Sequence, residues 1–281
     1  MRTLPLLALL CGCQEEILAA TVIEHLQIVS IVSERPKIQL GESTDLTVTI
    51  ADPDQLSPEV AVWICVPFGS QGRCLESELT GEAQPVYTGS RDPETHAFVT
   101  TVVPLGIDVE EINAQLDEGG TFSGVLAFAL ACAPGACDLF DQLESGTVDP
   151  SHLSNPSHLL RGVPMSQAHA AWRTLTIIGE GSAGASNPIL SVDFPEPFET
   201  QAGGSLDIRV ALDQPFSGQL FPMTTVGGFT EDAISVGAGS PFHNLTWLSH
   251  EREAGKTGHV YIVADDEVGG QAVQHASVSV R

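Results

Sequence analysis

Hydrophobic and polar positions follow a strand-like pattern along most of the chain. Residues 45–51 alternate with period two, as expected for an antiparallel strand with one buried face. Short β-branched or apolar runs, separated by turn-forming residues, predict the remaining strands. These lie at residues 26–32, 60–65, 96–103, 122–130, 171–178, 189–194, 205–212, 218–221, 244–248, 259–264 and 273–280. This pattern predicts an all-β protein built from sandwiches.

Two features divide the pattern into two domains. Residues 179–187 are rich in Gly, Ser and Ala and form the clearest linker. Residues 34–50 align without a gap on residues 196–212, with six identical positions that include Gly41/Gly203 and Asp45/Asp207. The repeat indicates one architecture used twice, with a glycine turn leading into the second strand of each sandwich. We expect domains at residues 22–178, with long loop insertions, and 188–281.

Helix is expected to be minor. In residues 107–116, Val109, Ile112 and Leu116 share one face, which predicts a short helix. Residues 138–143 fit another turn or two. Residues 146–167 are rich in Pro, Ser and His without periodicity, and we interpret them as a long excursion before the last strand of the first domain.

The N-terminus has the pattern of a bacterial lipoprotein signal. Arg2 precedes the apolar residues 4–10, a run too short to span a bilayer. Residues 10–13, Leu-Cys-Gly-Cys, resemble a lipobox, which implies cleavage after Gly12 and acylation of Cys13. We therefore expect a signal peptide at residues 1–12, a lipidated Cys13 and a tether over residues 13–21. A plain secretory signal and a short buried strand are the alternatives.

The charge of the chain bears on its partners. With 36 acidic and 11 basic residues, its formal charge is −25. Such a body is repelled by nucleic acid and by anionic headgroups, so a membrane must be reached through acyl chains, and two or more chains anchor stably. Gln14 provides no inner-membrane retention aspartate, which favours the outer membrane of the cell envelope.

Removal of the signal leaves four cysteines besides Cys13, namely Cys65, Cys74, Cys132 and Cys137. An even number in an exported protein predicts two disulfides, which could pair in three ways. Cys65 and Cys132 should end neighbouring antiparallel strands at opposite poles, so the local pairs Cys65–Cys74 and Cys132–Cys137 fit best. Neither spacing matches a zinc knuckle.

No catalytic motif stands out. His152, His158 and His169 fit no metal-binding spacing and are interpreted as solvated loop residues. Asp52 with Asp54, and residues 265–267, could hold calcium, but neither group matches a calcium loop. The chain has neither a G-x-S-x-G motif nor a glycine-rich phosphate loop before a helix. We therefore predict no catalytic residue, metal site or cofactor.

Several of these segments together resemble a family. Residues 26–36 leading to 41–54, then Trp63 with Cys65, Asn187–Pro188, and residues 260–270 with Gly269 and Gly270 are similar to lipoproteins of myxobacteria and related bacteria with immunoglobulin-like domains. Glu267 departs from the basic residue common in those relatives. The resemblance implies the fold and the anchor, and it implies no activity. Trp63 is also similar in placement to the core tryptophan of immunoglobulin strands.

The sequence thus predicts two immunoglobulin-like antiparallel β-sandwich domains after a lipoprotein signal peptide. The expected function is that of a lipid-anchored envelope protein with a non-enzymatic structural, adhesion or assembly role, whose partners are the membrane and other envelope proteins or glycans. Ligand contact is expected in the loops at the sandwich poles, including residues 66–74 and 133–170. The alternative is a carbohydrate- or calcium-binding accessory module of a surface system.

Overall fold

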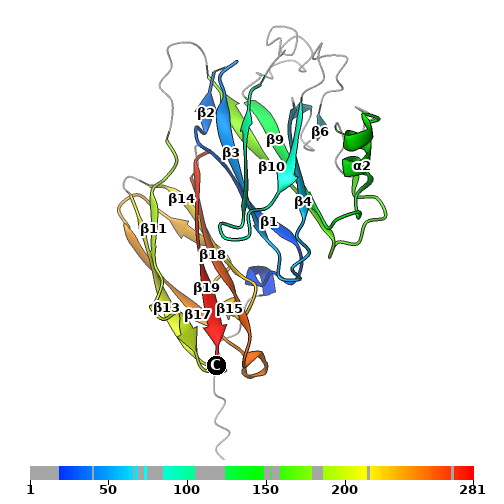
Figure 1. Ribbon diagram of the computed structural model, residues 1–281. Coiled ribbons are helices and arrows are strands. Elements are labelled where there is room, and N and C mark those ends of the chain that lie inside the picture. The colour runs from blue at the N-terminus through cyan, green and yellow to red at the C-terminus, as the bar shows by residue number, and fades with distance from the viewer. Residues whose placement is uncertain are drawn as a thin grey trace, which may run out of the picture.

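The computed structural model describes residues 19–39, 41–65, 67–68, 73–74, 85–104, 124–148, 153, 159–178, 186–213, 216–266 and 269–281. The predicted signal peptide, Cys13, the helix at residues 107–116, most of the linker, His152 and His158 lie outside these residues. The regular secondary structure of the described residues is almost entirely β-strand, and the strands form two sandwiches, shown in Figure 1.

The first sandwich pairs a three-stranded sheet with a five-stranded sheet. Along the five-stranded sheet, the short β2 lies parallel to β10, whereas the other neighbours are antiparallel. The three-stranded sheet contains β1 (Gln27–Ser33), β3 (Thr44–Ala51) and β8 (Ala97–Val102). The five-stranded sheet contains β2 (Lys37–Ile38), β10 (Ala168–Ile177), β9 (Gly124–Cys132), β4 (Glu59–Cys65) and β7 (Val86–Ser90), and a separate ribbon joins β5 (Pro67–Phe68) to β6 (Arg73–Cys74).

The second sandwich repeats this plan with two sheets of four and five strands. Here β12 lies parallel to the last strand, β19, as β2 does to β10. This arrangement is that of immunoglobulin-like sandwiches, so the predicted fold class is confirmed. The sheets are β11 (Leu190–Asp193), β13 (Ser205–Leu212), β17 (Phe242–Leu248) and β15 (Gly228–Phe229), and β12 (Glu199–Thr200), β19 (Gln271–Val280), β18 (Thr257–Asp266), β14 (Gly218–Thr224) and β16 (Ile234–Val236).

The internal repeat has a physical basis in one turn. Gly41 and Gly203 both have φ of +78°, a left-handed conformation that glycine adopts without steric cost. Each lies in a turn that follows the short parallel strand and precedes the second long strand of its sandwich. The turn hydrogen bonds run from the Glu42 N–H to the Gln39 carbonyl (3.1 Å) and from the Gly204 N–H to the Gln201 carbonyl (2.9 Å).

Strand β9 is buried along its whole length because both of its faces are covered. One face lies in the core between the two sheets, and the other is covered by α2 (Asp138–Ser145) and by residues of the excursion that follows it. Trp63 belongs to this second cluster and stacks on Phe128 with ring centroids 5.5 Å apart. Its neighbours Val62 and Ile64 face the core between the sheets. The likeness of Trp63 to the immunoglobulin core tryptophan is therefore wrong, because this side chain packs on the outer face.

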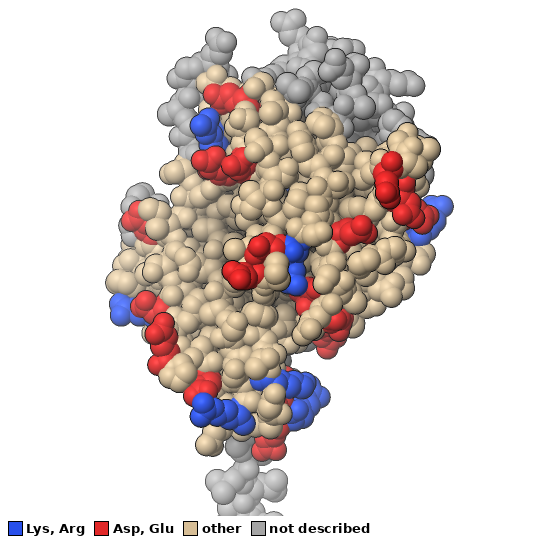
Figure 2. Space-filling model, viewed as in Figure 1, with Lys and Arg blue, Asp and Glu red and all other residues tan. Residues whose placement is uncertain are grey.

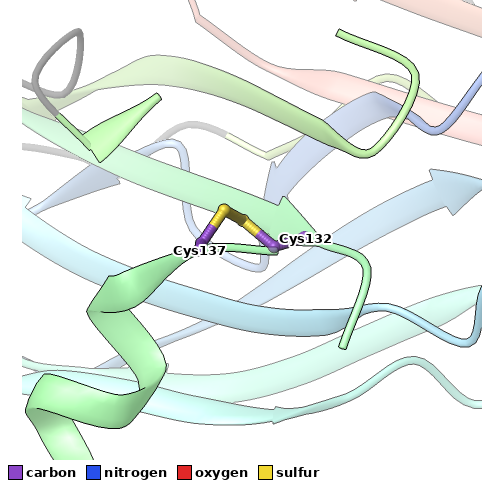
Figure 3. The surroundings of a disulfide bond; sticks show 2 residues. All are labelled: Cys132 and Cys137. Carbon is purple, nitrogen blue, oxygen red and sulfur yellow. A yellow bond between two sulfur atoms is a disulfide. The ribbon is translucent and has the colours of Figure 1, made fainter. Parts of the chain in front are cut away.

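Figure 3 shows the disulfide between Cys132, at the end of β9, and Cys137, just before α2. It agrees with the local pairing expected from the sequence. Cys65 is also disulfide-bonded, and the side chain of its expected partner, Cys74, lies outside the described side chains. In β4 and β9, Cys65 pairs with Leu126 and Glu59 with Cys132, so the two strand-end cysteines lie at opposite ends, as expected.

On the face seen in Figure 2, acidic side chains lie in small scattered groups, several of them beside a basic residue. The excess of acid is therefore spread over this face. No helix among the described residues is both long and apolar enough to cross a membrane.

Candidate functional site between the two sandwiches

The two sandwiches pack side against side, with β1 of the first along β18 and β19 of the second (Figure 1). The segment before β1 contributes to this joint. Val22 forms a parallel bridge with Thr224, and the Ile23 N–H donates to the Thr224 carbonyl at 2.7 Å. The Phe229 N–H donates to Oγ1 of Thr21 at 3.0 Å. The end of the expected tether, where Ala19–Thr21 form a 3-10 turn, thus lies against the second sandwich.

Apolar side chains fill the middle of the joint. Ile23, Ala51 and Tyr261 form a buried cluster to which Val29 and Met223 add partly buried contacts. These residues come from the N-terminal segment, from β1 and β3 of the first sandwich, and from β14 and β18 of the second. Burial of apolar surface of this kind holds the two bodies together as a core does.

Polar contacts flank the apolar cluster. The Arg173 guanidinium lies 3.1 Å from the Asp265 carboxylate and donates to the Gly269 carbonyl at 2.6 Å. Asn187 uses both ends of its amide, since it donates to the Ser33 carbonyl (2.6 Å) and accepts from the Gln271 N–H (3.0 Å). The residue that ends the predicted linker is therefore a bridge between the sandwiches.

Three histidines meet in the same joint, one from the first sandwich and two from the second. The histidine cluster consists of His96, His259 and His275, which each offer a ring nitrogen within 4.8 Å of the others. The His96 ring contacts His259 edge-on, with centroids 4.1 Å apart, and stacks on His275 at 5.0 Å. His96 is 6% exposed, so domain packing covers the cluster at its centre.

Strand periodicity positions the two histidines of the second sandwich. On β18, Val260 and Ile262 point into the core of the second sandwich, so His259 and Tyr261 point to the opposite face. His275 lies directly opposite Tyr261 on β19, where cross-strand neighbours share a face. The three side chains therefore form one polar and aromatic patch on a sheet face that the first sandwich covers.

A local backbone feature positions His96. It lies just before β8 with φ of +58°, a conformation that is rare for residues other than glycine. Its carbonyl accepts the Ile50 N–H at 2.8 Å, which fixes the residue against β3. The strained conformation thus directs the ring across the joint, where Nδ1 lies 2.7 Å from the Tyr261 hydroxyl.

Each ring of the cluster also has a polar partner outside it. His96 is hydrogen-bonded to Tyr261, and Nδ1 of His259 lies 3.4 Å from Oγ of Ser277. His275 is hydrogen-bonded to the backbone of Thr95. Such partners select a tautomer and leave the other ring nitrogen of each histidine available.

The surroundings favour neutral imidazoles. Burial lowers the pKa of His96 to about 4. The neighbouring His259, Arg91 and His275 lower this pKa further, whereas Asp92 raises it. Burial also lowers the pKa of His259, and that of His275 is lowered by burial and raised in part by its bond to Thr95. Burial raises the pKa of the Tyr261 hydroxyl. At neutral pH the cluster therefore offers uncharged nitrogen lone pairs.

One cation and one anion lie beside the cluster as a pair. The Arg91 guanidinium donates to Oδ2 of Asp52 at 3.3 Å, and the Asp52 side chain is fully buried. Asp52 also accepts the N–H groups of Leu56 (2.9 Å) and Ser57 (3.0 Å). The positive charge of Arg91 is thus offset by Asp52, and the histidines remain the groups in this joint that suit a transition metal.

Among the described residues, the histidine and aspartate residues considered as metal ligands from the sequence lie outside the histidine cluster. His169 was expected to be a solvated loop residue, whereas it lies half-buried in β10, where its Nδ1 accepts the Ile28 N–H at 3.2 Å. The carboxylates of Asp52 and Asp265, considered for calcium, are held by protein donors, namely Arg91 and Arg173. Both groups therefore have structural roles in the fold.

Sequence reasoning missed the histidine cluster. The one local indication was His259-Val-Tyr261, because a strand that alternates His and Tyr with core residues exposes an unusual aromatic face. Nothing in the sequence links that face to His96, since the two are 163 residues apart and meet only through the packing of the sandwiches.

Comparison with known proteins gave no matching family model and no match among curated proteins. Among solved structures, the chain is similar to the N-terminal Ig1–2 module of the Drosophila receptor protein tyrosine phosphatase DLAR, with 12% identity over 92% of this chain and 100% of that one, at a TM-score of 0.27. It is also similar to a 1.5-MDa bacterial ice-binding adhesin, with 12% identity over 92% of this chain and a TM-score of 0.26, and spans 65% of that chain. Titin Ig tandem A164–A165 matches at 12% identity over 92% of this chain and 96% of that one, with a TM-score of 0.21. The assignment of the fold rests on the strand order described above.

Proposed function

We propose that this chain is a lipid-anchored cell-envelope protein whose two sandwiches act as one stiff body in a non-enzymatic structural, adhesion or assembly role. The observation that carries the proposal is the set of specific contacts that join the two sandwiches. Contacts from the N-terminal segment, from Asn187 and from Arg173 all cross it. A body of this kind holds its end loops at a fixed distance and orientation from an anchor, which suits a spacer or a binding platform.

The proposed anchor is an acylated Cys13, the last residue of the lipobox-like segment 10–13. Its support comes from the sequence, because a body of charge −25 has no electrostatic attraction to anionic lipid. Acyl chains attach a protein to a membrane without help from its surface charge. The partners in this proposal are the membrane and other envelope proteins or glycans, contacted by the end loops of the sandwiches.

The anchor is tested by expression of the full chain in a Gram-negative host fed with labelled fatty acid. We expect the wild type to incorporate label and to fractionate with the outer membrane. Cys13→Ser should lose the label and accumulate as a longer precursor. Cys11→Ser is the matched control and should behave as the wild type. The proposal is wrong if the wild type takes up no fatty acid, or if Cys13→Ser remains labelled.

The stiff body is tested separately by calorimetry of the full chain in detergent. If the joint couples the sandwiches, they should unfold in a single cooperative transition. Two well-separated transitions that match two independent modules would contradict a stiff body, whatever the result for the anchor.

A further inference from the structure

We propose that His96, His259 and His275 form a binding site for a divalent transition metal ion of the zinc class, and that the bound ion fastens the two sandwiches to each other. The sequence-based expectation was that the chain has no metal site. The proposal does not depend on the envelope role, because it rests on the histidine cluster alone.

The donor set suits this class of ion. Imidazole nitrogen is a preferred ligand of Zn²⁺ and its neighbours in the first transition row, whereas Ca²⁺ and Mg²⁺ prefer oxygen. The three rings converge with nitrogens within 4.8 Å of one another. Ligands around a tetrahedral zinc ion lie about 3.4 Å apart, so modest ring rotations would close the site.

The hydrogen bonds of the rings have the form of second-shell contacts at metal centres. When Nδ1–H of His96 donates to the Tyr261 oxygen, the lone pair of Nε2 is free to bind an ion. When Nδ1–H of His259 donates to Ser277, the same holds for that ring. Metal ligands need this arrangement, in which a partner fixes the proton on one nitrogen and thereby the orientation of the ring.

The position of the site between the sandwiches determines what a bound ion would do. His96 belongs to the first sandwich and the other two ligands to the second, so one ion would cross-link residues 163 and 179 positions apart in the chain. The adjacent Arg91 opposes a cation, but its charge is offset by the buried carboxylate of Asp52 at 3.3 Å. Because the ion binds only when the sandwiches are docked, it stabilises the docked state by mass action.

The test is a titration of the full chain with Zn²⁺ alone, after treatment with EDTA, in detergent. We expect one tight equivalent in calorimetry and a rise in Tm of about 5–10 °C at a free ion concentration of about 100 times the Kd. Ca²⁺ should give no rise. Co²⁺ should produce the visible absorption band of a nitrogen-coordinated ion. Zn²⁺ should also slow amide hydrogen exchange in β1 and β18, on the two sides of the joint.

Two cluster variants are matched with one outside the cluster. His96→Asn suits a residue with positive φ, because asparagine tolerates that conformation, and His275→Gln preserves polarity and length. Each should lose the tight equivalent and the rise in Tm. His243→Asn, at the start of β17, should retain both.

The proposal is overturned if Zn²⁺ shows no saturable binding, or if the cluster variants bind it as the wild type does. If a cluster variant does not fold, the Co²⁺ spectrum of the wild type decides, because absence of the band excludes coordination by the histidines. Tight binding without slower exchange across the joint would overturn the fastening role.

Discussion

Arg173 on β10 and Asp265 on β18 form an ion pair across the joint, with 3.1 Å between Nη1 and Oδ2 and a second approach of 3.5 Å between Nη2 and Oδ1. Nη2 also donates to the Gly269 carbonyl, so one side chain holds both the strand and the turn that follows it. The Arg173 side chain is 11% exposed and that of Asp265 is 35% exposed. The pair is therefore shielded on the arginine side and partly screened on the carboxylate side.

We expect Arg173→Met to lower the free energy of unfolding by about 1–2 kcal/mol, because the Asp265 carboxylate loses its charged donor and keeps only the Gln271 amide, and the Gly269 carbonyl loses the Arg173 N–H. Urea unfolding of the full chain measures the loss, which should shrink at high salt. Arg161→Met removes an exposed arginine and should stay within about 0.5 kcal/mol of the wild type. Equal stability of the Arg173 variant and the wild type would show that the pair does not support the joint.

Asn187 provides a second test of the joint. Asn187→Ala removes the donor to the Ser33 carbonyl and the acceptor of the Gln271 N–H, and we expect a loss of about 1–2 kcal/mol in the free energy of unfolding. The neighbouring exposed Ser186→Ala is the control and should have little effect. If both variants unfold at the wild-type urea concentration, the bridge contributes nothing.

Histidine 169 should make the stability depend on pH. Burial lowers its pKa below the value of about 6.5 expected in the unfolded chain. The unfolded state thus takes up the proton first, and the contribution of this residue is complete above pH 6.5 and is lost as the pH falls toward the lower folded pKa. Protonation also removes the acceptor that Nδ1 offers to the Ile28 N–H.

We therefore expect His169→Asn, which retains an acceptor but does not titrate, to lose less stability than the wild type between pH 7 and pH 5. Urea unfolding of both chains at each pH gives the comparison, in which the other histidines cancel. Parallel pH profiles of the two chains would contradict this role.

The Cys132–Cys137 disulfide closes a very short loop between β9 and α2. Chain entropy predicts that its removal in the double variant Cys132→Ala, Cys137→Ala costs about 2 kcal/mol. The double variant is preferable to a reductant, because Cys65 is also disulfide-bonded. Unfolding in urea should show the loss, and a variant as stable as the wild type would contradict the entropic account.

The strands were predictable where periodicity and turn residues agree. The alternating run at residues 45–51 became β3 (Thr44–Ala51), and the aligned glycines Gly41 and Gly203 became equivalent turns. Shorter strands such as β2 and β12 have too few residues for a pattern to be visible. The start of β10 was missed because Ala168-His-Ala has little strand propensity and is held by pairing with the end of β9.

The candidate site depends on information that a local pattern does not contain. Periodicity places His259 and Tyr261 on one face of a strand, and the β18–β19 register brings His275 beside them. His96 joins these residues only because the two sandwiches dock and because its own positive φ directs the ring toward Tyr261. Neither follows from the sequence of a single strand, so the three histidines were considered in isolation and the cluster was not predicted.

The bridge between Val22 and Thr224 has a mechanical consequence. A pull on the chain from its N-terminal side reaches the second sandwich through Thr21 and Ile23 before it reaches β1 of the first. The second sandwich thus braces the strand that tension would otherwise peel away from its sheet. A force on the body would therefore be carried by both sandwiches, although only the first sandwich directly follows the N-terminal segment in the sequence.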